Sequence, residues 1–222
     1  MKFENTEVWG FEHAIRGMRN PLESWDKSDS EYSFYGDFYN IGKNDMDLMQ
    51  RLICAGSEHR KFMRQIMVSV DITAPLYWFK EFDTYKIGTV ANSTSTMHKL
   101  ASTPITMDCF EMGDFDKDLD ADDEESPISL KDYWENNVIW SLEYLRKKYL
   151  ETKNKRYWKE LIRLLPESWL QTRTVTLNYE NLLNMCSKGQ RRFHKLTEWS
   201  VDFINWCKKL PYAQELLFID EV

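Results

Sequence analysis

The sequence predicts a helix-rich fold of the mixed α+β class. Two observations favour this class. Most apolar residues recur at helical spacing in segments that end at Gly or Pro. One segment, residues 172–177 (TRTVTL), instead alternates β-branched residues with others, which is typical of a strand. The chain has 222 residues, 42% of them hydrophobic, and no internal repeat, so we expect a single domain over 1–222.

Composition excludes several classes of function. The formal net charge of -7 disfavours a general binder of nucleic acid or of an anionic membrane, because such proteins neutralise phosphates with cations. No apolar run has the roughly 18 residues that a membrane span needs. The N-terminal segment mixes charges into its apolar residues and lacks the core of a signal peptide. We therefore expect a cytoplasmic protein whose partners include no nucleic acid and no membrane.

The four cysteines are widely spaced, and no histidine stands at metal-ligand spacing beside them. We expect reduced thiols and no metal site. Residues 114–125 (DFDKDLDADDEE) place acidic groups at several ligand positions of a calcium loop. Because Leu119 occupies the position where that loop needs Gly for its sharp turn, the segment is better interpreted as a solvated acidic loop.

The first half of the chain is less regular. Residues 1–40 are aromatic and rich in turn signals, and we expect an irregular segment. Asn44 can cap a helix that runs from Asp45 towards Ala55 and stops at Gly56. The apolar positions of 57–70 fit a second helix, although the end of this segment fits a short strand equally well.

Pro75 then marks a break or a first helical turn. Residues 87–96 are small and hydroxylated, which favours a loop folded against a ligand. The second half of the chain shows a regular helical pattern. Its expected helices are Leu130 to about Leu150, Lys155 to Leu164, Tyr179 to about Cys186, and Phe193 to Lys209.

Two clusters are candidate functional sites because of the residue types that they contain. Glu58 and His59 follow an expected helix, and this pair is either a surface feature or a proton-transfer pair. Residues 86–99 (KIGTVANSTSTMHK) are rich in hydroxyls. Backbone amides near Gly88 and these hydroxyls can cradle an anion, and an ordinary turn cluster explains the composition equally well.

The order of these segments resembles that of the flavin-dependent thymidylate synthases, the ThyX family. That family has an E-H pair, an A-P step, a signature R-H-R-x-x-S-x-N-E-x-S-x-R-Y and a later T-x-N. This chain has Glu58-His59, Ala74-Pro75, residues 84–98 (TYKIGTVANSTSTMH) and Thr176-Leu177-Asn178 in the same order. The resemblance extends over about residues 45–218 and implies a central, mostly antiparallel sheet flanked by long helices.

The resemblance also implies a site, residue by residue. It places Ser95 beside the reacting uracil ring, as the catalytic position. The implied cofactor-binding residues are Glu58, His59, Tyr85, Lys86 and Asn178. The implied substrate-binding residues are Thr89, Asn92, Ser93 and His98. Arg191 and Arg192 join them through a register shift, because the family arginine itself falls on Gly189.

The signature departs from the family at its cations. The R-H-R triplet falls on Thr84, Tyr85 and Lys86, and the final Arg-Tyr falls on Met97 and His98. Lysine is a point charge where arginine offers a fork to a phosphate, and methionine offers nothing. Other cations either replace these contacts or are solvated surface charges; they are Arg60, Lys61, Arg64, Lys80, Arg191 and Arg192.

Members of the family methylate dUMP with methylenetetrahydrofolate and NADPH, use FAD, and assemble as homotetramers. The leading expectation is therefore a ThyX-like, flavin-dependent methyltransferase for dUMP or a related pyrimidine nucleotide. An alternative is a catalytically inactive homologue that acts as a homo-oligomeric nucleotide-binding or regulatory protein. Another is an enzyme altered to act on a different pyrimidine nucleotide.

Overall fold

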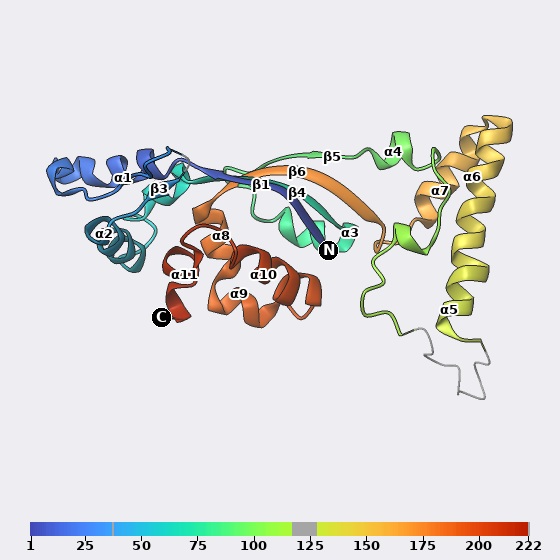
Figure 1. Ribbon diagram of the computed structural model, residues 1–222. Coiled ribbons are helices and arrows are strands. Elements are labelled where there is room, and N and C mark those ends of the chain that lie inside the picture. The colour runs from blue at the N-terminus through green and yellow to red at the C-terminus, as the bar shows by residue number, and fades with distance from the viewer. Residues whose placement is uncertain (37, 117–127, 222) are drawn as a thin grey trace. The chain divides into compact units, whose positions relative to one another are not determined.

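A computed structural model describes residues 1–36, 38–116 and 128–221 (Figure 1). Most of the acidic segment 114–125 lies outside these residues. The chain forms two compact units. Unit 1 contains Met1, Thr73–Lys80 and Ser93–Arg173, and unit 2 contains Lys2–Ile72, Glu81–Asn92 and Thr174–Val222.

Four of the described strands form a sheet in the order β1-β4-β6-β5. The strands are β1 (Lys2–Trp9), β4 (Met67–Pro75), β5 (Val90–Ser93) and β6 (Leu170–Asn178). Threonine and serine hydroxyls pair between β4 and β6, at 2.9 Å for Ser69 and Thr176 and 2.8 Å for Thr73 and Thr172. Residue numbers rise along one strand as they fall along the other, so this pair is antiparallel. The antiparallel central sheet of a helix-rich α+β fold is therefore confirmed.

Unit 2 combines its part of the sheet with short helices. The helices are α1 (Phe11–Arg19), α2 (Lys43–Cys54), α8 (Tyr179–Cys186), α9 (Lys188–Phe193), α10 (Ile204–Cys207) and α11 (Ala213–Leu216). In Figure 1, α8 to α11 lie below β1 and β4. A small hairpin, β2 (Glu31–Tyr32) with β3 (Tyr39–Asn40), precedes α2.

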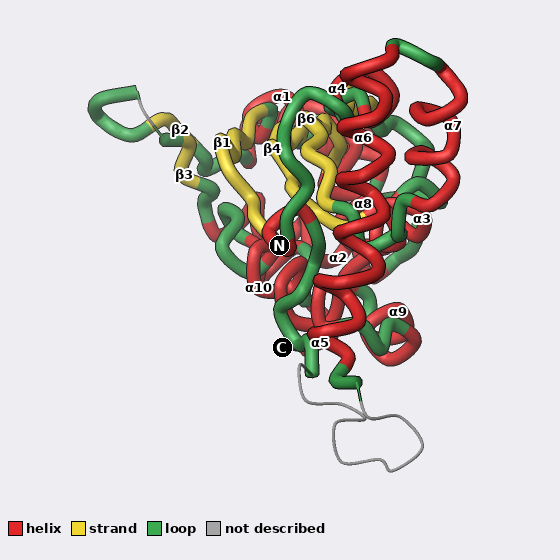
Figure 2. The backbone as a smooth tube through the Cα atoms, turned by 90° about the vertical axis from the view of Figure 1, so that its right-hand side faces the viewer, coloured by secondary structure: helices red, strands yellow, loops and turns green. Residues whose placement is uncertain are grey.

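Unit 1 has a helical core. Its helices are α4 (Thr96–Lys99), α5 (Leu130–Tyr133), α6 (Trp140–Thr152), α7 (Lys155–Leu164) and, as far as Lys80, α3 (Leu76–Phe82). Residues 134–139 form a π-helical turn that joins α5 to α6. Figure 2 shows α6 and α7 side by side; Lys153, with φ 55°, makes the reversal between them. The buried core of this unit is Leu100, Ile105, Phe110, Leu142 and Leu161.

The expectation that residues 1–40 are irregular is wrong. This segment contains β1, α1 and the β2–β3 hairpin. β1 escaped recognition because it is an edge strand with mostly exposed residues, so it lacks the apolar alternation of a half-buried strand. α1 buries Phe11, Ala14 and Ile15, but its nine residues are too few for a strong periodic signal.

Asn44 does not cap the next helix. The helix α2 begins at Lys43 after Gly42, so Asn44 lies inside it. The side chain of Asp29 takes the capping role, because its carboxylate accepts hydrogen bonds from the amides of Asn44 at 2.9 Å and Asp45 at 3.1 Å. A cap supplied from a residue so far back in the sequence leaves no local signal.

Of the two interpretations of residues 57–70, the strand is correct at the end of the segment. A 3₁₀ turn over 61–65 leads into β4, whose alternate residues Val68, Val70 and Ile72 are buried. Residues 87–96 include β5 rather than only a loop. The helix expected from Phe193 instead begins as a π-helical turn over 198–203 and continues into α10.

The other expected elements are confirmed. They are the helices near 130–150, 155–164 and 179–186 and the strand over 172–177. Among the described residues no helix could cross a membrane, and no group of three His, Cys, Asp or Glu side chains is placed to hold a metal ion. The four cysteines are free thiols.

Candidate functional site

Ser95 and His98 form a polar pair in unit 1. Thr94 fixes the end of β5, since its amide donates to the carbonyl of Thr172 at 2.9 Å. Ser95 is then the N-cap of α4, and its Oγ accepts a hydrogen bond from the amide of His98 at 3.1 Å. The same Oγ lies 2.7 Å from Nδ1 of His98. The cap therefore fixes the imidazole ring beside the hydroxyl.

A cavity of about 370 Å³ opens beside this pair, within unit 1. It is lined by Met97, His98, Ala101, Tyr149, Lys155 and Trp158. The indole nitrogen of Trp158 donates to the carbonyl of Met97 at 3.0 Å, so the wall of the cavity is tied to α4. Two aromatic side chains and one ammonium group are the features that hold a planar base and a phosphate.

Asn178 lies in unit 2, where it caps α8. Its side chain accepts from the amide of Asn181 at 3.0 Å, and the side chain of Asn181 accepts from the amide of Asn178 at 3.2 Å. The amide of the Asn181 side chain also donates to the carbonyl of Ile87 at 2.8 Å. Gly88 has φ +75°, and a Cβ there would lie 2.8 Å from the Asn178 side chain. Asn181 thus holds the turn that precedes β5, and the Asn178 side chain lies beside Gly88 in that turn.

A second cavity, of about 320 Å³, adjoins this turn in unit 2. Its lining residues are Arg64, Met67, Ile87, Gly88, Asn178, Glu180, Asn181 and Asn184. Glu180 is buried and forms an ion pair with Arg60. Nε of Arg60 lies 3.1 Å from each of the two carboxylate oxygens of Glu180. Arg60 also donates to the Asn184 side chain at 3.2 Å. The charge of Arg60 is therefore already neutralised.

The residues that replace the R-H-R triplet occupy ordinary surface and packing positions. The ring of Tyr85 lies 5.8 Å from that of Trp199, and burial, followed by the negative charge of Glu81, raises the pKa of its hydroxyl. Lys86 is exposed. The hydroxyl of Thr89 donates to the carbonyl of Tyr85 at 2.7 Å, so it serves the turn itself.

Several other predicted site residues are on the surface. Glu58 and His59 lie in the exposed turn after α2, and in the described part of the chain neither side chain has a hydrogen-bond or ion-pair partner. Asn92 and Ser93 are exposed on β5. The predicted residues also divide between the units: Ser93, Ser95 and His98 belong to unit 1, and the others belong to unit 2.

Arg191 is held by the C-terminal segment. One of its terminal nitrogens lies 3.2 Å from both carboxylate oxygens of Asp220, and the other lies 2.9 Å from Glu221. Its guanidinium is also 5.4 Å from the centre of the Phe218 ring. The predicted substrate contact by Arg191 therefore competes with two carboxylates. Arg192 lies on the same helix, and its side chain is outside the described part of the structure.

His194 was not predicted from the sequence. Its ring stacks on Trp199 with centroids 4.1 Å apart, and Nε2 lies 3.6 Å from Glu81. Burial lowers the pKa of this imidazole, against the opposing effect of Glu81. No motif surrounds His194 in the sequence. The one sequence signal for its packing is Trp199, an aromatic residue five positions later.

The matched positions offer few cations to the flavin that the resemblance implies, and Arg64, in the lining of the second cavity, is a further one. FAD carries a pyrophosphate, and its binding calls for cations in direct contact. Of the three positions matched to R-H-R, only Lys86 is cationic, and it is exposed. The arginines Arg60 and Arg191 are both engaged by carboxylates of unit 2.

Compared by sequence, the chain matches no protein-family profile and no curated protein. Compared by structure, it is similar to the flavin-dependent thymidylate synthase ThyX of Helicobacter pylori in complex with FAD and dUMP. The TM-score is 0.65 at 16% identity, with 99% of each chain covered. A second structure of that protein with FAD and dUMP gives a TM-score of 0.64 at 17% identity, covering 99% of this chain and 98% of the other. The resemblance stated from the sequence is confirmed at the level of the fold: this chain has the fold of the flavin-dependent thymidylate synthases.

Proposed function

We propose that this chain is a nucleotide-binding protein of the ThyX fold, and that a pyrimidine nucleotide of the dUMP class binds in the cavity beside Ser95 and His98. The observation that carries the proposal is the composition of that cavity. It combines the imidazole of His98, which Ser95 orients from beside the cavity, with the ammonium group of Lys155 and the rings of Tyr149 and Trp158. In the proposal, the protein acts in the cytoplasm as a homo-oligomer.

The chemistry of the ligand matches each part of this cavity. Stacking of a base on an aromatic side chain contributes about 1–3 kcal/mol. A charge-assisted hydrogen bond from Lys155 to a phosphate contributes about 1.5–3 kcal/mol more. Ser95 and His98 supply donors and acceptors for the edge of a uracil ring. The similarity in fold to a protein solved with dUMP supports this ligand class over other anions.

Flavin-dependent methyl transfer with folate and NADPH is the second candidate. It is favoured by the retention of Asn92 and Ser95 at positions matched to the family signature. The loss of two cations at the positions matched to R-H-R and the pairing of Arg191 with Asp220 and Glu221 weigh against it, because they leave fewer cations for the flavin phosphates. We therefore favour a homologue that binds the nucleotide without the flavin reaction.

The purified full-length chain separates the two candidates. We expect a colourless preparation whose thermal transition rises with dUMP and does not respond to FAD. A preparation that retains flavin and converts dUMP to dTMP in the presence of methylenetetrahydrofolate and NADPH would establish the enzyme instead. A transition unchanged by dUMP, UMP and dTMP would overturn the assignment of a pyrimidine nucleotide.

A further inference from the structure

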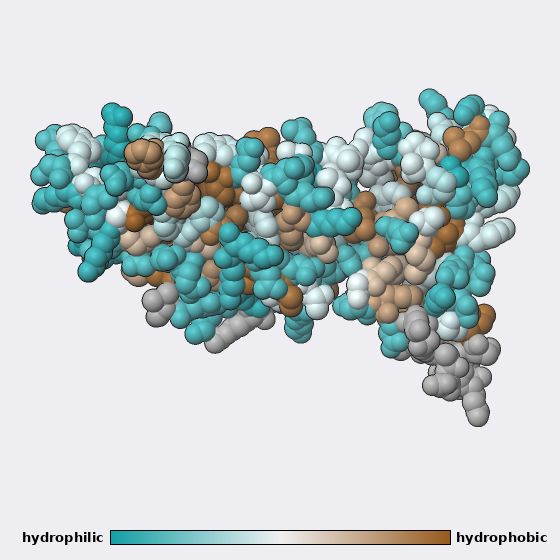
Figure 3. Space-filling model, viewed as in Figure 1, coloured by the Kyte–Doolittle hydropathy of each residue, from teal (hydrophilic) through white to brown (hydrophobic). Residues whose placement is uncertain are grey.

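An aromatic cavity in unit 2 lies outside the candidate nucleotide site. Its volume is about 370 Å³, and it opens between the start of α1 and the β2–β3 hairpin. Its lining is dominated by aromatic side chains, and these are Trp9, Phe11, Tyr32, Phe38 and Tyr39. Figure 3 shows hydrophobic residues exposed over this hairpin, among hydrophilic neighbours.

The rings stand at steep angles to one another, as in a cage. Tyr32 and Tyr39 meet edge to face, with centroids 4.9 Å apart and planes at 74°. Phe11, which is buried, meets Tyr212 behind the lining at 5.5 Å and 77°. Aromatic side chains from α1 and from the hairpin thus border the cavity, and the faces of such rings carry negative charge density.

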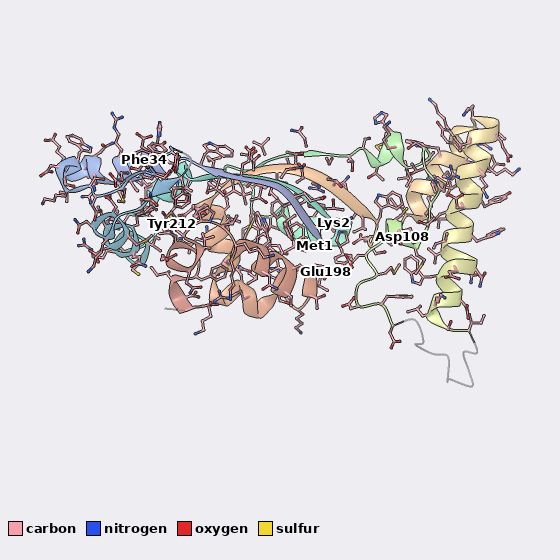
Figure 4. The ribbon with its side chains drawn as sticks, in the orientation of Figure 1. Met1, Lys2, Phe34, Asp108, Glu198 and Tyr212 are labelled. Carbon is pink, nitrogen blue, oxygen red and sulfur yellow. The ribbon has the colours of Figure 1, made fainter. Side chains whose placement is uncertain are left out.

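The cage is held in place before any ligand binds. The hydroxyl of Tyr212 donates to the carbonyl of Tyr39 at 3.0 Å and accepts from the amide of Ile41 at 3.0 Å. Figure 4 labels Tyr212 and, on the hairpin, Phe34. At the other wall Gly10 has φ +96°, and a Cβ there would lie 2.1 Å from the carbonyl oxygen of Gln65. The walls therefore have little freedom to collapse into the cavity.

A carboxylate and an imidazole, those of Glu12 and His13, line the cavity, and the carboxylate brings a full negative charge to it. The hydroxyl of Tyr32 donates to Glu12 at 3.0 Å. The N-terminus of α1 also opens here, but its partial charge of about +0.5 is outweighed by the full charge of a carboxylate. In agreement, burial and then the negative charges of Glu12 and Asp45 raise the pKa of Tyr39.

We propose that this cavity binds a small organic cation, a free alkylammonium or quaternary ammonium compound, with its methyl groups against the rings and its charge beside Glu12. The faces of Tyr, Trp and Phe attract such cations, and an ammonium that carries alkyl groups loses less hydration on entering an aromatic cage than a bare one. The occupant differs from the nucleotide in charge and in site. A failure here would leave the proposed nucleotide site untouched.

Calorimetric titration of the full chain with choline and with 3,3-dimethylbutan-1-ol tests this proposal, because the alcohol has the shape of choline without its charge. We expect choline to bind at least about fivefold more tightly than the alcohol. Equal binding of the two would overturn the proposal in favour of a purely apolar cavity, and binding of neither would overturn it outright.

Two variants assign the site. Glu12→Gln removes the charge and Phe38→Leu removes a ring while keeping an apolar side chain; each is expected to weaken choline binding about fivefold or more. Glu7→Gln is the matched control, since it removes the same charge from an exposed residue of β1 that does not line the cavity. An equal loss of choline affinity in Glu7→Gln and Glu12→Gln would mean that the overall negative charge of the protein attracts choline, and would contradict the site.

A trimethyllysine peptide that binds at least about tenfold more tightly than choline would overturn the assignment of a free small molecule.

Discussion

The hydroxyl oxygen of Ser95 lies 2.7 Å from Nδ1 of His98 and also accepts a hydrogen bond from the backbone amide of that histidine. The Ser95 side chain thus caps α4 and orients the imidazole of His98 at the edge of the cavity that Lys155 also lines. Structure and proposed binding are coupled at this residue, so a single substitution is expected to affect both.

Replacing Ser95 with alanine is expected to cost about 1 kcal/mol in the free energy of unfolding, the usual cost of losing an N-cap. It is also expected to weaken dUMP binding about tenfold, because the imidazole loses its orienting partner. Urea denaturation and calorimetry measure the two effects. Ser102→Ala is the control, since Ser102 is exposed on the same unit, does not line the cavity, and donates its hydroxyl to the carbonyl of Lys99. Unchanged dUMP affinity in Ser95→Ala would contradict the role of this pair.

The pairing of Arg60 with Glu180 is expected to stabilise unit 2. Arg60→Met leaves the buried carboxylate of Glu180 without its guanidinium, at a cost of about 2–3 kcal/mol in urea denaturation. The ion pair of Arg51 with Asp47 is exposed, so Arg51→Met is expected to cost less than about 0.5 kcal/mol. Equal losses in the two variants would show that burial does not set the strength of the first pair.

Gly88 requires both a positive φ and empty space, and Gly36 requires only the first. Both have φ near +70°, but a Cβ at Gly88 would lie 2.8 Å from the Asn178 side chain, whereas at Gly36 nothing lies within 4 Å. We expect Gly88→Ala to cost about 1–2 kcal/mol more than Gly36→Ala in thermal or urea unfolding. Equal costs would mean that Asn178 moves freely, against its role as the capping residue of α8.

The buried carboxylate of Asp45 predicts a loss of stability in acid. Burial tends to raise the pKa of Asp45, but hydrogen bonds from neighbouring side chains outweigh burial and hold the pKa below its usual value. Those donors are Ser30, Ser28 and Arg19. A lowered pKa in the folded state contributes stability that is present above the pKa of the unfolded chain and is lost as the pH falls through that of the folded one.

Asp45→Asn is therefore expected to cost about 3 kcal/mol at neutral pH, because buried Arg19 loses its counter-ion. Urea midpoints measured from neutral pH down to the acid range should fall less steeply in Asp45→Asn than in the unsubstituted chain. Asp47→Asn, at an exposed position on the same helix, should keep the original slope. A slope that is the same in all three proteins would contradict a lowered pKa at Asp45.

The elements predicted correctly share local signals. The helices near 130–150 and 155–164 have periodic apolar residues and end at a turn or at Pro166. The missed elements depend on distant partners. β1 is a strand because β4 lies beside it, and α2 begins where Asp29 reaches its amides. A sequence pattern cannot report a cap or a strand partner supplied from elsewhere in the chain.

The site shows the same division. The pairing of Ser95 with His98 spans three residues, so the signature contained both of its members. The rest of their cavity comes from α6 and α7, where Tyr149, Lys155 and Trp158 carry no motif. Conversely, a register shift in the resemblance could bring Arg191 to a family contact, but only the fold shows that Asp220 and Glu221 engage it.

The most direct test of the account compares the binding of dUMP and deoxyuridine to the full chain by calorimetry. The account predicts that dUMP binds at least about tenfold more tightly, and that Lys155→Gln removes this difference while leaving deoxyuridine binding unchanged. Lys159→Gln, which removes an exposed charge from the same helix outside the cavity, should keep the difference. Binding of dUMP that is equally tight in Lys155→Gln, or no binding by the unsubstituted chain, would contradict the assignment of the nucleotide to this cavity.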